Sequence, residues 1–101
     1  MIQDPRYWNR SDWHNANKIP CEPGCYALLD ANDHVLYIGR SKMLWNRLRN
    51  PDKHNGFKRV KQSFKTLTIS WLTGWPIYDI EKVLIEMWKP PLCQDFIKRK
   101  G

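Results

Sequence analysis

Two short apolar runs separated by a polar turn constrain the fold of this chain more than any other feature. The runs cover residues 24–29 and 35–39, and the polar turn between them is at Asp30-Ala31-Asn32-Asp33. Asn and Asp favour tight turns, and apolar runs of this length bounded by such a turn are typical of strands. The pattern therefore predicts a β-hairpin.

The hairpin would place two tyrosines on one face. Side chains alternate across a strand, so a turn at Asn32-Asp33 puts Tyr37 opposite Leu28 and Tyr26 opposite Gly39. A glycine at that position leaves room for a group to approach the Tyr26 phenol. Paired hydroxyls suggest a site, although tyrosine pairs also occur simply because tyrosine is a good strand former.

Length and charge limit the class of protein. The chain has 101 residues, 42% of them hydrophobic, which predicts one folded domain. Seventeen Lys and Arg against ten Asp and Glu give a net charge of +7, which favours a polyanionic partner. No apolar run reaches the length of a membrane span, and no signal peptide opens the sequence. We expect a cytoplasmic protein with no membrane partner.

The three cysteines, Cys21, Cys25 and Cys93, indicate free thiols in a reducing compartment, because their number is odd and no secretion signal precedes them. The alternative is a zinc site that adds Cys93 or His14 to the first two. Three residues separate Cys21 from Cys25, a spacing that fits known zinc patterns poorly.

Residues 1–21 are interpreted as an N-terminal extension packed on a domain of residues 22–101. Ser11-Asp12 could cap a short helix that runs through Lys18. The aromatic side chains of the extension, Tyr7, Trp8 and Trp13, are expected to pack on the domain. The alternative is that Trp8 or Trp13 stacks on a nucleobase.

The remaining elements follow from periodicity. Ser41 is a suitable N-cap for a helix through Arg49 that turns Met43, Leu44, Leu48 and the edge residue Arg47 toward the protein. Further patterns predict a helix over 57–64, a half-buried strand over 66–71 and a helix over 77–88. The expected fold is a small α+β domain with a three-stranded, mostly antiparallel sheet, in the order β-β-α-α-β-α.

Glu81 interrupts the apolar side of the last predicted helix. At 100° per residue it falls among the core-facing positions, which are Ile77, Ile80, Val83, Leu84, Met87 and Trp88. A buried carboxylate must pair, protonate or bind a cation. The alternatives are a salt bridge at the edge of the core and a metal-binding or acid–base role. Glu86 falls on the solvent side.

Basic residues are concentrated directly after the hairpin. Between Arg40 and Lys65 there are nine Lys or Arg and one acid, Asp52. This distribution suits the nucleic-acid backbone better than an acidic membrane, because the apolar residues here are needed for the core. The candidate contacts are Arg40, Lys42, Arg49, Lys53, Lys58, Arg59 and Lys61.

Taken together, Gly24-Cys25-Tyr26, Tyr37-Ile38-Gly39, Arg47 eight residues later and Glu81 resemble the motifs of the GIY-YIG nucleases. The resemblance spans roughly residues 22–93. It includes the spacing of the tyrosines, the motif glycines Gly24 and Gly39, and the proline-containing exit from the last helix.

The resemblance implies a metal-dependent endonuclease that hydrolyses DNA phosphodiester bonds. Tyr26 would be the general base and Tyr37 would help to position water and phosphate, while Arg47 would stabilise charge on the phosphate. Glu81 would be the single protein ligand of one Mg²⁺ or Mn²⁺. A phenol needs nearby cationic charge to act as a base at neutral pH. Many family members also have a histidine or a further tyrosine after the helix that carries the arginine, and His54 is the nearest candidate in this chain.

Two departures stand out. Cys93 occupies the position where the family usually has an asparagine, and a thiol is the weaker hydrogen-bond partner; Cys25 replaces an isoleucine. The alternatives are therefore a nucleic-acid-binding module without turnover and an unrelated basic α+β interaction protein. The expected partner is DNA, either branched or damaged or reached through another protein, and the expected state is a monomer or weak dimer.

Overall fold

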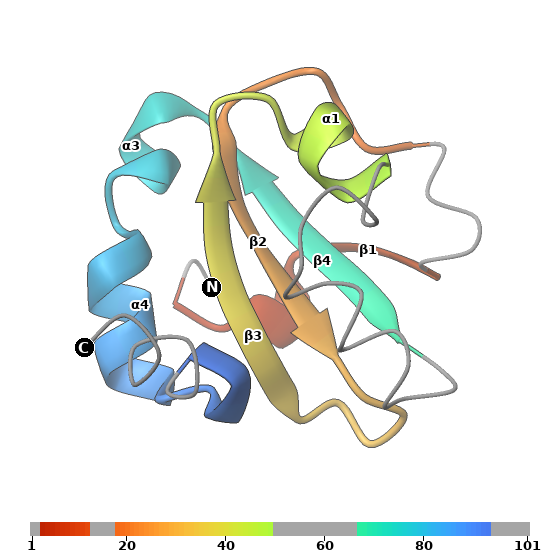
Figure 1. Cartoon of the computed structure of the whole chain (residues 1–101), viewed down its shortest axis with the longest axis vertical. Helices are drawn as coiled ribbons and strands as arrows, with labels where there is room; N and C mark the ends of the chain where they lie inside the picture. Colours follow the sequence, from red (N-terminus) through yellow and green to blue (C-terminus); the bar gives the residue numbers. More distant parts are fainter. Residues whose placement is uncertain (1–2, 13–17, 50–66, 94–101) are drawn as a thin grey trace.

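A computed structural model of the chain describes residues 3–12, 18–49 and 67–93 (Figure 1). The elements are the 3-10 helix η1 (Pro5–Tyr7), β1 (Asn9–Asp12), β2 (Gly24–Leu29), β3 (Val35–Ser41), α1 (Leu44–Arg49), β4 (Thr68–Thr73), α3 (Trp75–Tyr78) and α4 (Glu81–Trp88). The predicted helix over 57–64 lies outside the described residues.

The sheet is antiparallel and has four strands in the order β1-β4-β2-β3. The α+β class is confirmed, but the prediction of three strands was wrong, because the extension contributes β1. Ser11 and Asp12, predicted to cap a helix, belong to this strand, in which Asn9 lies opposite Trp71 and Asp12 opposite Thr68. The free edge of β4 offers backbone hydrogen bonds that a short polar segment can fill.

The hairpin has the predicted register, with Tyr26 opposite Gly39 and Leu28 opposite Tyr37. The Asp30 carboxylate accepts hydrogen bonds from the backbone N–H groups of Asn32 and His34, each at 2.9 Å. β3 continues two residues beyond the predicted end at Gly39, and it forms the open edge of the sheet next to α4 (Figure 1).

Helices cover both faces of the sheet. On one face, the α1 residues Leu44 and Leu48 pack in a cluster that includes Tyr26, Ile69 and Trp71. On the other, Leu84 of α4 packs in a second cluster, with Trp8, Cys25, Ala27, Leu29, Val35 and Ile38. β4 is therefore buried on both faces at its centre, where Ser70 is 0% exposed, and the predicted half-buried strand was wrong on this point.

Helix boundaries shift some predicted core residues to the surface. Ser41 ends β3 and its hydroxyl accepts from the Met43 N–H at 3.0 Å, so α1 begins only at Leu44 and Met43 is exposed. The last predicted helix is two helices, α3 and α4, separated at Asp79-Ile80. This break changes the helical phase, so Leu84, Ile85 and Trp88 face the protein while Val83 and Met87 are exposed.

The aromatic residues of the extension differ in burial. Trp8 is buried, as expected, which excludes base stacking by its ring in this conformation, whereas Tyr7 is 72% exposed. Trp13 lies outside the described residues. Within the described ranges, no helix has the length and apolar character needed to cross a membrane.

Candidate active site

Tyr26, Tyr37 and Arg47 converge on one face of the sheet. The Arg47 Nε donates to the Tyr26 Oη at 3.2 Å, and the two tyrosine rings are stacked with centroids 6.0 Å apart. Each residue comes from a different element, since Tyr26 lies on β2, Tyr37 on β3 and Arg47 on α1. The prediction that Arg47 turns toward the protein is confirmed, because its side chain is half-buried.

Gly39 makes the position of the Tyr26 hydroxyl possible. A Cβ atom added at residue 39 would lie 2.5 Å from the Tyr26 Oη and 2.9 Å from the Tyr37 Cε1, closer than van der Waals contact allows. The space that the sequence reserves opposite Tyr26 is therefore filled by the phenol itself. Gly24, the other motif glycine, serves the backbone instead, since its added Cβ would collide with the Leu72 carbonyl oxygen of β4.

The environment of Tyr26 opposes its ionisation. Burial raises the pKa of Tyr26 well above 10, the neighbouring Tyr37 adds to the shift, and the Arg47 guanidinium lowers it only in part. Burial also raises the pKa of Tyr37. Both phenols are therefore protonated at neutral pH, and Tyr26 is 0% exposed.

Glu81 lies at the open edge of β3, next to Arg40. Its Oε1 is 3.7 Å from the Arg40 Nε. Burial raises the pKa of Glu81 above 4.5, and the charges of Arg40 and then Arg47 oppose that rise. The carboxylate on the apolar helix side is thus paired with a cation at the edge of the core, and Arg47 is near enough to influence it.

Cys93 occupies the same edge two residues along β3. Its Sγ donates to the Ile38 carbonyl oxygen at 3.2 Å and accepts from the Ile38 N–H at 3.4 Å. Burial raises the pKa of the thiol to about 11, so it is neutral at physiological pH. Cys93 therefore satisfies the outward backbone groups of Ile38 on the edge strand β3.

A family model describes the same part of the chain. Residues 22–73 match the UvrC-like GIY-YIG domain, which is about half of the sequence. The chain belongs to the GIY-YIG family. Within this match lie both GIY-YIG tyrosines, both motif glycines and Arg47.

Solved structures match a larger share of the chain than the family model does. The N-terminal GIY-YIG endonuclease domain of UvrC from Thermotoga maritima, bound to its catalytic magnesium, is 28% identical with a TM-score of 0.57, over 74% of this chain and 86% of that one. An asparagine-to-alanine and a tyrosine-to-phenylalanine mutant of that domain, each bound to its catalytic divalent cation, match over the same shares at 28% and 27% identity, both with a TM-score of 0.57.

The other predicted site residues are not all described. Arg40 and Lys42 are exposed, whereas the side chain of Arg49 and residues Lys53, His54, Lys58, Arg59 and Lys61 lie outside what the structure describes. For the zinc alternative, residues 3–12, 18–49 and 67–93 contain no group of three His, Cys, Asp or Glu side chains that could hold a metal. Cys25 instead donates from Sγ to the Ile77 carbonyl oxygen at 2.9 Å.

Two features of this region were missed from the sequence. Arg40 was predicted as a nucleic-acid contact but not as the partner of Glu81, and its guanidinium also lies 4.5 Å from the centre of the Tyr78 ring. Strand alternation could have indicated this, because residue 40 must point to the face opposite Gly39 and Tyr26. Nothing in the local sequence identified Tyr78.

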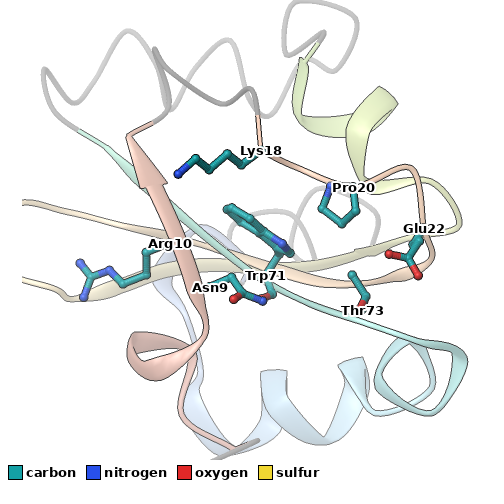
Figure 2. Close-up of a pocket in the computed structure, with 7 residues that line it drawn as sticks. All are labelled: Asn9, Arg10, Lys18, Pro20, Glu22, Trp71 and Thr73. Atoms are coloured by element: carbon teal, nitrogen blue, oxygen red, sulfur yellow. The ribbon is translucent and has the colours of Figure 1, made fainter.

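A separate cavity of about 430 Å³ lies on the same sheet face, toward β1 (Figure 2). Trp71 separates it from the tyrosines, because it pairs with Asn9 of β1 on one side and with Tyr26 of β2 on the other. Figure 2 shows the Arg10 guanidinium turned away from the indole of Trp71, and it pairs with Asp33 at 2.6 Å. The lining carries both charges, from Lys18 and Glu22.

Proposed function

We propose that this GIY-YIG domain is a divalent-metal-dependent endonuclease that hydrolyses DNA phosphodiester bonds at the Tyr26–Tyr37–Arg47 cluster. The observation that carries the proposal is the 3.2 Å hydrogen bond between Arg47 and the Tyr26 hydroxyl, made on a sheet face that Gly39 keeps open for that hydroxyl. Arg47 would bind a phosphate oxygen through its guanidinium group. Tyr26 would accept the proton of the attacking water, and Tyr37 would orient that water.

Glu81 fits the role of metal ligand. Its carboxylate is a hard oxygen donor, and it already neutralises a cationic side chain at 3.7 Å. Mg²⁺ keeps several waters, so one carboxylate is sufficient when phosphate oxygens complete its shell. When bound, such an ion supplies Lewis-acid polarisation of the phosphate and stabilises the leaving oxygen. The relatives from Thermotoga maritima, whose structures hold a catalytic divalent cation, support this assignment.

Turnover requires a change around Tyr26. In the described conformation the phenol is buried and its pKa is raised. It therefore keeps its proton at neutral pH and cannot act as a general base. Arg47 already opposes this shift, and additional cationic charge beside the phenol would lower its pKa further. We therefore infer that Tyr26 becomes competent as a base only when substrate is bound.

The test is nicking of supercoiled plasmid. We expect nicking with Mg²⁺ or Mn²⁺ and none with excess EDTA, and losses of at least about 100-fold in Glu81→Gln and Arg47→Gln, the size typical of removing one electrostatic catalytic group. Glu86→Gln is the matched control, because Glu86 is an exposed glutamate on the same helix. Equal nicking by wild type and Glu81→Gln would overturn the proposal.

A second function, DNA binding without turnover, is favoured by two features. Cys93 stands where the family usually carries an amide, and the burial of Tyr26 points in the same direction. Cys93→Asn separates the two functions. If the domain only binds DNA because Cys93 replaces the amide, the wild type will bind DNA in a salt-sensitive manner without nicking plasmid above the EDTA background, and Cys93→Asn will gain nicking.

A further inference from the structure

An exposed aromatic residue lies on α3, the helix that directly precedes α4 and Glu81. Trp75 begins α3 and is 55% exposed, and its ring meets the Tyr78 ring edge to face, with centroids 5.3 Å apart. Neither ring belongs to the two hydrophobic clusters of the described core. An exposed indole at this position therefore contributes little to the packing of the domain.

The backbone holds Trp75 in this position. Gly74 has a φ of 115°, which side chains with a Cβ rarely adopt, and its N–H donates to the Pro23 carbonyl oxygen at 2.7 Å. The Tyr78 N–H then donates to the Gly74 carbonyl oxygen at 3.0 Å. The indole is thus presented from a fixed turn next to β2, and α3 lies beside the end of the sheet at which β3 leads into α1 (Figure 1).

A continuous series of contacts links this indole to Glu81. The Arg40 guanidinium lies over the Tyr78 ring, 4.5 Å from the ring centre, and the Arg40 Nε is 3.7 Å from the Glu81 Oε1. The series runs Trp75, Tyr78, Arg40, Glu81. It joins an exposed aromatic face to a cation, the combination used to hold single-stranded nucleic acid, and it ends at the carboxylate proposed above as the metal ligand.

We propose that Trp75, supported by Tyr78 and Arg40, stacks on an unpaired nucleobase of the DNA strand whose phosphate is cut. The proposal rests on the proposed function and names its substrate class. A base inside a duplex has both faces covered by its neighbours, so only a frayed, flipped or single-stranded base can use this surface. The domain should accordingly prefer substrates with an unpaired base beside the cleavage position, such as flaps and bubbles.

Binding without cleavage tests this proposal separately from catalysis. In EDTA, the affinity of the wild type and of Trp75 variants is measured for a flap substrate with 2-aminopurine at its unpaired position and for the matching full duplex. We expect Trp75→Leu to weaken flap binding about 5- to 150-fold, because 1–3 kcal/mol per stacked base corresponds to that range at 1.4 kcal/mol per tenfold. Trp75→Phe should retain most of the affinity.

The duplex and a second aromatic residue are the controls. Full-duplex affinity should change less than twofold in Trp75→Leu, and 2-aminopurine fluorescence should be quenched by wild type and by Trp75→Phe but not by Trp75→Leu. Tyr7→Leu, at an aromatic residue that is still more exposed and lies on η1 away from α3, should bind the flap as the wild type does.

Unchanged flap affinity in Trp75→Leu overturns the proposal, as does an equal loss for flap and duplex or the same loss in Tyr7→Leu. These outcomes do not depend on plasmid nicking. A folded protein that stacks on the flap but never nicks would refute the proposed catalysis and keep the stacking surface.

Discussion

Gly39 links the hairpin register to the chemistry of the cluster. Any side chain at this position meets the Tyr26 hydroxyl at 2.5 Å, and the phenol cannot move aside easily because Tyr26 is completely buried. We predict that Gly39→Ala nicks plasmid roughly 100-fold more slowly than wild type, since a misplacement of about 1 Å at a reacting group costs that much. Initial nicking rates measure the effect, and circular dichroism checks the fold.

Tyr26→Phe is the control for this prediction. If the alanine acts by displacing the hydroxyl, Gly39→Ala and Tyr26→Phe lose rate to a similar extent, and the double variant loses little more than either. Nicking by Gly39→Ala at the wild-type rate would show that the Tyr26 hydroxyl is not needed where the structure has it.

The thiols provide a prediction that depends on pH. Burial raises the pKa of Cys25 to about 12 and that of Cys93 to about 11, and only the thiolate reacts with a disulfide reagent. At pH 8 we expect one fast equivalent with Ellman's reagent, from exposed Cys21, and three after addition of urea. Cys21→Ser should abolish the fast equivalent. Fast reaction of two or more thiols in the folded protein would contradict the burial.

The same shifts affect stability with a definite sign. Both folded-state pKa values lie above the value of 9.0 that the thiols have when unfolded, so above pH 9 the folded state holds more protons than the unfolded state. The free energy of unfolding should therefore be unaffected by these thiols below pH 9 and should fall as the pH rises from 9 toward 11. Urea unfolding curves across this interval measure the loss, and Cys93→Ala should reduce it.

The orientation of a residue within a segment of clear periodicity could be predicted from the sequence. The contacts between elements far apart in the sequence could not. Strand alternation and a known turn fix Tyr26 against Gly39, and helical spacing turns Arg47 toward them. Glu81 could be identified as a misplaced carboxylate, but its partner Arg40 depends on where α4 crosses the edge of β3. The two hydrogen bonds between Cys93 and Ile38 depend on the same crossing, which no local pattern encodes.

At the scale of elements, the break between α3 and α4 decides which residues of the last helix are buried. Leu84 is 1% exposed and Val83 is 58% exposed, although one continuous helix over 77–88 would bury both. We predict that Leu84→Ala lowers the free energy of unfolding by about 2–5 kcal/mol, as large-to-small core substitutions do. Val83→Ala should change it by less than about 0.5 kcal/mol. Urea denaturation compares the two variants. Similar losses in the free energy of unfolding would indicate one continuous helix over 77–88 and contradict the break between α3 and α4.

β1 shows why a strand can lack a sequence signal. Asn9, Arg10, Ser11 and Asp12 are all polar, with three of them exposed, so neither alternation nor propensity favours a strand here. The strand forms because β4 is buried at its centre and offers an unpaired edge, and because Trp8 anchors the segment beneath the sheet. Tertiary context therefore decides the conformation of β1.

At the scale of the whole molecule, the net charge of +7 predicts how binding depends on salt. Each phosphate neutralised by a Lys or Arg releases counterions, so the logarithm of the DNA association constant falls linearly with the logarithm of salt concentration. The position of each cation then matters as much as the total. Lys42 is exposed between β3 and α1, the elements that carry Tyr37 and Arg47, whereas Lys89 is exposed at the C-terminal end of α4.

Lys42→Gln and Lys89→Gln carry the same net charge and therefore separate local contact from total charge. If Lys42 contacts a phosphate, Lys42→Gln should lower the slope of the salt dependence by about 0.9 for duplex DNA and weaken binding equally for unrelated sequences. Lys89→Gln should keep the wild-type slope, because screening at 0.15 M salt limits its influence to roughly 8 Å. Fluorescence anisotropy titrations from 50 to 200 mM salt would measure all three slopes in excess EDTA. Identical salt-dependence slopes in the two variants would mean that Lys42 matters no more for DNA binding than Lys89 does. DNA would then not approach from the side of the tyrosine cluster.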